Sequence, residues 1–308
     1  MSWLANHPFS TKRLAGYVGR RCRETRVKEL ARELKLNWKT VKSLEKAYMR
    51  EQLRRTGSPG PKAIGIDEIS IKKGHTYRMV VSDLMRRWTI WFERVYRSKQ
   101  SMDLFYQWLE ERKAAGMRLA VMDMWRATMK HAPQAAILDD KFHVMRRLGK
   151  ALDTVRKQEY KRLTEKDRSW IKGQKYTLLS RKANLTLEGH RALNKLLGAN
   201  KRLHTAYLLK EAFGQLWEYQ TEGWARKFFE NWKASLKWQR LKPYEEFAEM
   251  LERHWDGIAA YSKAENKVSF GLVEEVNNKI GMIQRRGYRF HDEEDLRLKV
   301  LPCMLKPV

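Results

Sequence analysis

Hydrophobic residues near the start of the chain recur every three or four positions, the spacing of one helix face. Two such runs predict two helices within residues 25–50: Val27, Leu30, Ala31 and Leu34, then Trp38, Val41, Leu44 and Ala47. Only the turn KLN separates them, and its Asn37 is a suitable cap for the second helix. This is the helix-turn-helix plan, in which the second helix enters the major groove; a plain helical hairpin is the alternative. Polar residues that would then face DNA are Lys39, Thr40 and Lys42.

A second domain is expected beyond a linker. The segment RRTGSPGPKA, at residues 54–63, holds two glycines, two prolines and a serine, which favours a linker over regular structure. We therefore predict an amino-terminal helix-turn-helix domain at 1–53, a linker at 54–62 and a second domain at 63–308. Three runs beyond the linker are rich in β-branched and aromatic residues and predict an antiparallel meander: AIGIDEISI, HTYRMVVSDL and RWTIWFERVY.

The pattern then changes to helices alternating with short strands. SMDLFYQWLEERKAAG predicts an amphipathic helix, MRLAVMDMW and AAIL predict strands with a short helix between them, and DDKFHVMRRLGKALDTVRKQ begins a long helix. This order is typical of an α/β domain with parallel strands after the meander. From about residue 145 to 265 the periodicity predicts helices and no strand. Four tryptophans there are expected in the core, with stacking on DNA bases as the alternative: Trp217, Trp224, Trp232 and Trp238.

Composition adds a strong charge asymmetry. The 308 residues carry 64 Lys and Arg against 36 Asp and Glu, a formal net charge of +28, and 43% are hydrophobic. Such an excess favours a polyanionic partner, nucleic acid first and a membrane surface second, over a neutral substrate. No apolar run approaches about 18 residues, so no spanning helix is expected. The two cysteines predict neither a zinc site nor a disulfide framework, and no secretory signal is recognised, so a cytoplasmic protein is expected.

Two aspartates lie in or at the end of apolar strands. Asp67 falls within AIGIDEISI, and Asp123 ends the apolar part of MRLAVMDMW. A carboxylate in an apolar strand is costly unless it is paired or binds a metal ion. If these strands are parallel neighbours, both carboxylates emerge at one sheet edge, where a third acid would complete a site for two Mg²⁺ or Mn²⁺ ions about 4 Å apart. A turn or cap role is the alternative for each. Competing acids are Glu68, Asp83, Asp139 and Asp140.

The segment VEEVNNKIGMIQRRGY, residues 273–288, carries the best candidate for the third acid. On a helix, one apolar seam is formed by Val273, Val276, Ile280 and Ile283. Glu274 shares a flank with Asn277 and has no cation three or four positions after it, whereas Glu275 and Lys279 are spaced for an ordinary ion pair. We therefore predict Glu274 as the third ligand.

Polar and basic residues near these acids are candidates for DNA contacts. Asn277 and Asn278 could contact DNA or orient a ligand, and the arginines of QRRGYR could hold phosphates. Two lysines in the turn after the first predicted strand are further candidates. The basic candidates for DNA contacts are therefore Lys72, Lys73, Arg285 and Arg286.

Several long blocks, spread over essentially the whole chain, resemble the ISL-three family of bacterial insertion-sequence transposases. They are GIDEISIKKGHTYRMVVSDL, VMDMW, APQAAIL, DKFHV, KGQKYTLLS, LKWQRLKPYEEFAEMLERHWDGIAAY and VEEVNNKI. The resemblance implies an α/β fold: an RNase H-like mixed sheet with a large all-helical insertion at about 145–265, preceded by a helix-turn-helix domain. It also implies a DDE-type transposase whose catalytic acids Asp67, Asp123 and Glu274 hold Mg²⁺ or Mn²⁺. Its partners would be the element's terminal inverted repeats, target DNA and a second copy in a homodimer on DNA, in a bacterial cytoplasm at the nucleoid.

Departures from the family pattern suggest a second hypothesis. Family members typically begin with a cysteine-rich zinc-binding region, and this sequence starts beyond it. The connection after Asp123 is a few residues shorter than usual, and Glu275 stands where the family has glycine. The alternative is therefore a truncated, catalytically impaired DNA-binding remnant that represses transposition, and a nuclease or resolvase is a third hypothesis. His143, in DKFHV, is expected near the sheet in a structural or catalytic role.

Overall fold

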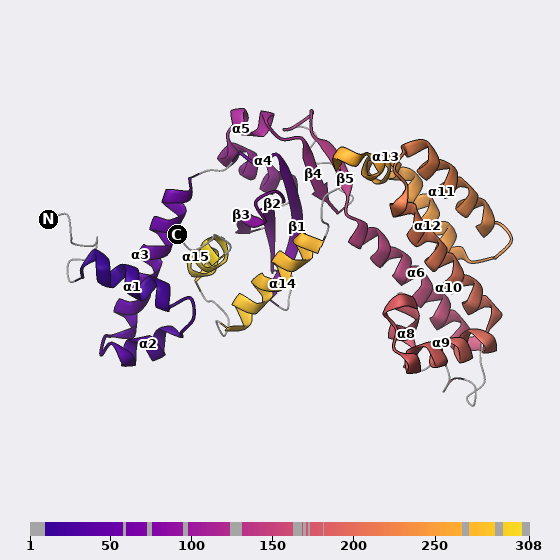
Figure 1. The fold of residues 1–308 in the computed structure, drawn as a ribbon, viewed down its shortest axis with the longest axis horizontal. Coiled ribbons are helices and arrows are strands. Elements are labelled where there is room, and N and C mark those ends of the chain that lie inside the picture. Colours follow the sequence, from indigo (N-terminus) through magenta and orange to yellow (C-terminus); the bar gives the residue numbers. More distant parts are fainter. Residues whose placement is uncertain are drawn as a thin grey trace. The chain divides into compact units, whose positions relative to one another are not determined.

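The structure, a computed structural model, describes residues 10–57, 60–72, 76–94, 98–123, 131–162, 168, 171, 173–180, 182–266, 271–286 and 292–303. The chain forms two compact units (Figure 1). The first comprises Met1–Ala120, Ala127–Ala135 and Gly271–Val308, and the second comprises Val121–Arg126 and Ala136–Phe270. The last two described helices, which follow the second unit in sequence, therefore belong to the first unit.

Three helices open the first unit: α1 (Lys12–Arg21), α2 (Val27–Glu33) and α3 (Trp38–Thr56). Their shared core includes Val18, Leu30, Val41 and Leu44. The predicted cap of the second predicted helix, α3, is confirmed, because Asn37 Oδ1 accepts the backbone N–H of Lys39 at 2.9 Å. α2 and α3 are the two helices that the periodicity predicts, and α1 adds a third that it did not indicate. The helix-turn-helix assignment stays a prediction.

A five-stranded sheet follows, with the strand order β3-β2-β1-β4-β5. The strands are β1 (Ala63–Lys72), β2 (Thr76–Asp83), β3 (Trp88–Arg94), β4 (Leu119–Met122) and β5 (Ala136–Asp139). β2 pairs antiparallel with both β1 and β3, which confirms the predicted meander. The sheet and its many helices are consistent with the expected RNase H-like domain. The parallel direction of the last two strands stays a prediction, and the short helix expected between them falls largely outside the described residues.

Four further helices belong to the first unit: α4 (Ser98–Leu109), α5 (Glu111–Ala115), α14 (Gly271–Arg286) and α15 (Glu293–Cys303). The predicted apolar seam of α14 is confirmed, because Val273, Val276 and Ile280 are buried. The seam shares one core cluster with β2, β3 and α15, whose members include Val80, Phe92, Leu296, Val300 and Leu301. α14 also contacts β1 (Figure 1).

α14 packs tightly against β1 at Gly65. A Cβ atom at this position would lie 2.6 Å from Val273 Cγ2 and 3.0 Å from Leu84 Cδ2. Real Cβ contacts are not that short, so a side chain here would force α14 or its valine to move. The glycine therefore permits the close packing of this helix on the strand.

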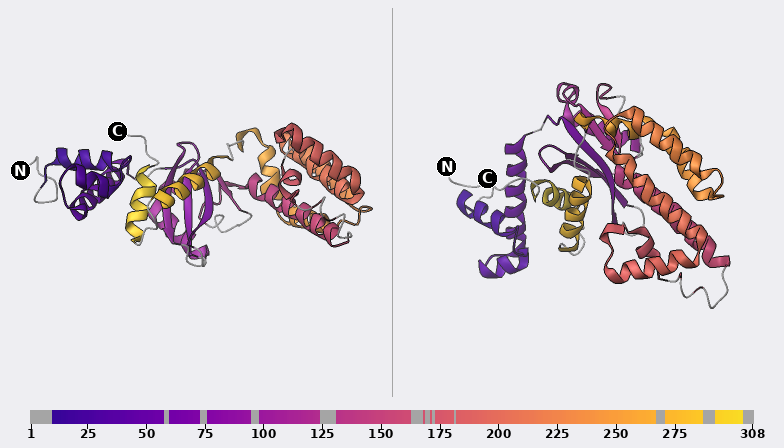
Figure 2. Two further views of the ribbon diagram at one scale, coloured as in Figure 1. Left: turned by 90° about the horizontal axis from the view of Figure 1, so that it is seen from below. Right: turned by 45° about the vertical axis from the view of Figure 1, so that its right-hand side comes forward.

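Every regular element described over residues 141–266 is a helix, and no strand occurs among them, as predicted for about 145–265. Its longer helices are α6 (Lys141–Arg162), α9 (Leu187–Ala199), α10 (Lys201–Phe213), α11 (Glu222–Leu236) and α12 (Lys242–Arg253). Shorter ones are α8 (Lys175–Leu179), α13 (Trp255–Ala259), η2 (Lys182–Asn184), η3 (Gly214–Glu218), η4 (Ala260–Ser262) and η5 (Ala264–Asn266). α6 lies beside α10 and α12, as the views of Figure 2 show. None of the described helices has the length and apolar composition needed to cross a membrane.

The prediction that four tryptophans fill the core of this unit is only half right. Trp217 and Trp232 are buried, at 4% and 5% exposure. Trp224 and Trp238 are 61% and 81% exposed, so their assignment to the core is wrong. Trp224 lies on the side of α11 away from the buried Phe229 and Leu236, and Trp238 follows the end of that helix. The spacing of the tryptophans alone does not show which of them face the core.

We predict that Gly65→Ala destabilises the protein by about 1–3 kcal/mol, because the new methyl group overlaps Val273. The matched control is Gly60→Ala, since a Cβ at Gly60 meets no atom within 4 Å. Urea unfolding followed by circular dichroism measures both. Equal unfolding midpoints for the two variants would contradict the close contact of α14 with β1.

Candidate active site

Asp67 is held at both carboxylate oxygens. Its Oδ1 accepts the backbone N–H of Glu68 at 2.8 Å, and its Oδ2 accepts the side-chain amide of Asn277 at 2.6 Å. A carboxylate only accepts hydrogen bonds, so the amide nitrogen of Asn277 must face it. The other amide atom, Asn277 Oδ1, is buried without a hydrogen-bond partner in the described structure. From its sequence Asn277 is a candidate for contacting DNA or for orienting a ligand, and in the structure it contacts the predicted catalytic aspartate.

Glu274 lies on the same flank of α14 as Asn277, because residues three apart on a helix are neighbours. Its side chain is exposed and forms no ion pair with any residue that the structure describes. Asp67, Asn277 and Glu274 thus come from one strand and one turn of one helix in the first unit. This leaves Glu274 available to a ligand that also contacts Asp67.

The neighbouring acid, Glu275, has a different partner from the one predicted. Its Oε2 lies 3.0 Å from Arg87 Nη2, and the expected ion pair with Lys279 is absent among the described contacts. Arg87 sits at φ 62° in the turn between β2 and β3, a tertiary neighbour that helical spacing cannot reveal. Both side chains of the pair are about two-thirds exposed, at 63% and 65%, so the pair contributes about 0–1 kcal/mol. Glu275 is thereby drawn to the flank away from Asn277.

Asp123 directly follows β4, the strand next to β1 in the sheet, and belongs to the second unit. His143, buried on α6, brings Nδ1 to 3.2 Å from Asp123 Oδ2, and Arg147 Nη2 lies 3.7 Å from Oδ1. The hydrogen bond from His143, then the charges of His143 and Arg147, hold the pKa of Asp123 below its usual value, although burial opposes them. Asp123 Oδ1 is buried and accepts no hydrogen bond in the described structure.

His143 also contacts Arg146, whose Nη2 lies 2.9 Å from the same Nδ1 atom. The two contacts are alternatives, because Nδ1 carries a proton when it donates to Asp123 and a lone pair when it accepts from Arg146. The spacing of DKFHV from Asp123 gave no sign of either contact. Both depend on the packing of the start of α6 near the end of β4.

The competing acids have structural partners. Asp83 is buried, and its Oδ1 accepts the N–H groups of Met85 and Arg86 in the turn after β2. Asp140 Oδ1 accepts the N–H of Phe142 at the start of α6. Asp139 is buried, and its Oδ2 lies 3.9 Å from His254 Nδ1. Asp83 and Asp140 thus have turn and cap roles, and only Glu68 among the four is exposed.

The predicted DNA-binding residues fall into several groups. Lys39 is exposed at the start of α3 with Thr40 half-buried beside it, and Asn278 and Arg285 are exposed on α14. Lys73 and the side chains of Lys72 and Arg286 lie outside the described residues. Lys42 Nζ lies 3.1 Å from Asp295 Oδ2 on α15.

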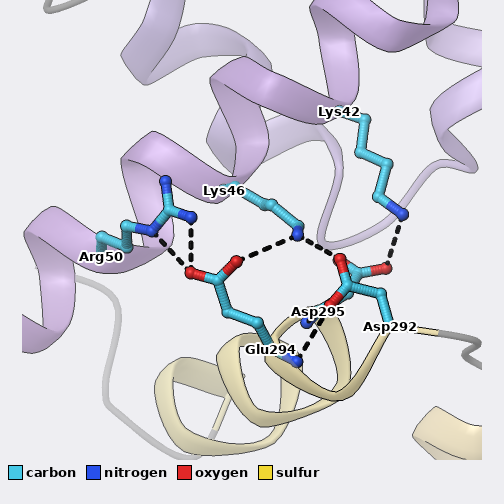
Figure 3. Close-up of polar contacts among 6 residues, drawn as sticks. All are labelled: Lys42, Lys46, Arg50, Asp292, Glu294 and Asp295. Atoms are coloured by element: carbon cyan, nitrogen blue, oxygen red, sulfur yellow. Dashed lines mark hydrogen bonds and ion pairs between the residues drawn. The ribbon is translucent and has the colours of Figure 1, made fainter.

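Lys42 is part of a larger charged contact between α3 and α15 (Figure 3). Three acids from the start of α15, here called the acidic turn, face three cations of α3: Asp292, Glu294 and Asp295 against Lys42, Lys46 and Arg50. Glu294 accepts from Arg50 Nε at 2.9 Å and from Lys46 at 3.2 Å, and Asp292 also pairs with Lys46. The sequence signal for this contact is the acidic run DEED, residues 292–295, in a chain of net charge +28.

Metal-ligating groups are divided between the two units. Asp67 and Glu274 belong to the first and Asp123 to the second, and no set of three His, Cys, Asp or Glu ligands occurs within the described residues. The donor set is nevertheless all oxygen, which suits Mg²⁺ or Mn²⁺. Asn277 Oδ1 and Asp123 Oδ1 are buried atoms without hydrogen bonds, and a cation or its water would satisfy such atoms.

Comparisons with known proteins agree over most of the chain. The family model for ISL3-type DDE transposases, described as a transposase, matches residues 64–300. The transposase for insertion sequence element IS1001 of Bordetella parapertussis is 31% identical over 307 residues, 97% of this chain and 75% of that protein. The transposase for insertion sequence element IS1557 from two strains of Mycobacterium tuberculosis is 25% identical over 320 residues, 95% of this chain and 70% of that protein. No solved structure matches the chain. The chain therefore belongs to the ISL3 family of transposases.

Proposed function

We propose that this chain cleaves DNA strands at the ends of an insertion sequence and joins them to target DNA, with Asp67, Asp123 and Glu274 as its catalytic acids. The observation that carries the proposal is the contact of Asn277 with Asp67, one helical turn from Glu274. It brings the helix that supplies the third predicted acid to the strand that supplies the first. The family match over residues 64–300 supports the same assignment.

The three carboxylates would hold Mg²⁺ or Mn²⁺. When bound, such ions assist the attack of water or a 3′-hydroxyl on phosphorus and offset the charge on the leaving oxygen. Metal binding requires carboxylates that are held in position, and neighbouring side chains of the chain hold them. Asn277 orients Asp67, while His143 and Arg147 orient Asp123.

DNA would be held by the basic surface of the chain. The net charge of +28 favours the phosphate backbone of both the terminal inverted repeats and the target. Lys39, Thr40 and Lys42 at the start of α3 are proposed to contact one DNA segment. The other residues proposed to contact DNA are Lys72, Lys73, Asn278, Arg285 and Arg286. A homodimer bound to two element ends completes the proposal.

Adjacent glutamates provide a matched test. Glu274→Gln is expected to reduce metal-dependent cleavage and joining by at least about 100-fold, since even the outer partners of metal ligands are worth about 10- to 100-fold. Glu275→Gln should stay within about threefold of wild type, because Glu275 pairs with exposed Arg87. The assay uses a labelled duplex that carries the element's inverted repeat, a supercoiled target, and Mg²⁺, Mn²⁺ or EDTA.

The same assay separates the alternative functions. Equal losses in the two glutamate variants would contradict the assigned role of Glu274. Salt-sensitive DNA binding by the wild-type chain, without metal-dependent cleavage, would favour the repressor hypothesis. Cleavage without joining would favour a nuclease or resolvase.

Adjacent asparagines provide a second matched test. Asn277→Leu removes the donor to Asp67 and is expected to raise the Mn²⁺ concentration for half-maximal cleavage by about tenfold. Asn278→Leu, at an exposed position on the same helix, should leave that concentration unchanged even where it weakens DNA binding. An unchanged Mn²⁺ requirement in Asn277→Leu would remove Asn277 from the site.

A further inference from the structure

The outward face of α3 is basic. At about 100° of rotation per residue, Lys39, Lys46 and Arg50 lie in a narrow arc opposite Val41 and Leu44, which are buried in the core of the amino-terminal helices. In a helix-turn-helix the outward face of the second helix is the one that enters the groove. A stripe of cations on that face suits DNA phosphates.

The acidic turn of α15 occupies most of this stripe (Figure 3). Glu294 binds both Lys46 and Arg50, and Asp292 binds Lys46 a second time. Hydrogen bonds from Arg50 and then Lys46 hold the pKa of Glu294 below its usual value, and that from Lys46 does the same for Asp292. Both carboxylates are therefore negative at neutral pH. Among the three cations of the stripe, Lys39 is exposed and has no acidic partner among the described ion pairs, whereas Lys46 and Arg50 are paired.

α15 has other anchors that hold it in place. Leu296 and Val300 are buried against the sheet and α14, and Lys299 pairs with the buried Glu45 of α3. Glu293, which precedes Glu294, turns to the sheet and pairs with Arg78 at 2.8 Å. Among the ion pairs of the acidic turn, that of Arg50 with Glu294 is exposed on both sides, and such pairs add little to folding stability beside these contacts. The main effect of the ion pairs of the acidic turn is to neutralise the stripe.

We propose that the acidic turn is a built-in competitor for DNA: its carboxylates occupy the cations of α3 that would otherwise bind DNA phosphates. DNA binding must then displace Asp292 and Glu294 from Lys46 and Arg50. The inference rests on the proposed DNA-binding role of α3. The start of α15 would then limit DNA binding by α3. The free protein would bind DNA more weakly than it would if Lys46 and Arg50 had no acidic partners.

The test compares Glu294→Gln with Glu293→Gln in the full chain. Each removes one negative charge from the same turn, but Glu294 pairs with Lys46 and Arg50 of the stripe, whereas Glu293 pairs with Arg78 of β2. Fluorescence anisotropy measures binding to a duplex with the inverted repeat and to an unrelated duplex, at low and moderate salt. Glu294→Gln should bind both duplexes at least about threefold more tightly than Glu293→Gln, with a larger difference at low salt. Asp292→Asn is a second variant that removes the other carboxylate on Lys46, and circular dichroism confirms folding.

The outcomes separate this inference from the proposed function. Equal or weaker DNA binding by Glu294→Gln and Asp292→Asn, relative to Glu293→Gln, would overturn the proposed competition. The acidic turn would then only hold α15 against α3. DNA binding by the wild-type chain in that case would leave the proposed function intact. Failure of wild type and every variant to bind either duplex at low salt would overturn both.

Discussion

The packing of α14 on β1 determines which polar groups face one another in the first unit. Its seam valines and Ile280 are buried, and Gly65 removes the side chain that would hold helix and strand apart. As a result Asn277 reaches Asp67 across 210 positions of sequence. Because Glu274 lies one helical turn from Asn277, the same packing that buries the seam also positions the residue that we propose as the third acid. Stability and the arrangement of the site therefore depend on one interface.

Charge is organised by the same unit. A chain of net charge +28 would repel itself if its cations clustered without acids nearby, yet α3 carries a basic stripe on its outward face. The acidic turn of α15 offsets that stripe, while the remainder of α15 packs beside α14 on the sheet. The helix that completes the core thus also sets the electrostatic state of the predicted DNA-binding helix. Burial and charge balance are met by the two faces of one short helix.

Local patterns were enough to predict much of this arrangement. The meander, the cap at Asn37 and the seam of α14 depend on spacing and residue type within a few positions, and the structure has all of them. The resemblance to a transposase family agrees with the family match. The sequence also limits the candidate acids to a few, because a carboxylate in an apolar strand is costly without a partner. The catalytic roles of Asp67, Asp123 and Glu274 remain proposals.

The features that sequence did not indicate are tertiary contacts. Glu275 pairs with Arg87 in a distant turn rather than with Lys279 on its own helix. The side-chain amide of Asn277 donates a hydrogen bond to Asp67. Trp224 on α11 and Trp238 just beyond it are exposed, although their sequence spacing resembles that of the buried tryptophans. The acidic turn pairs with cations of α3 that lie 244 or more positions earlier in the sequence. Periodicity defines a face of a helix, but only packing determines what that face contacts.

The central claim is that Asp67, fixed by Asn277 beside Glu274, is part of an oxygen site for a divalent cation. Electron paramagnetic resonance of Mn²⁺ bound to the full chain, with and without an inverted-repeat duplex, tests it without relying on catalysis. Asp67→Asn is compared with Glu68→Gln, because successive strand residues point to opposite faces of the sheet. The account predicts that Asp67→Asn weakens Mn²⁺ binding by about tenfold or more and that Glu68→Gln does not. Equal Mn²⁺ affinities for the two variants would contradict it.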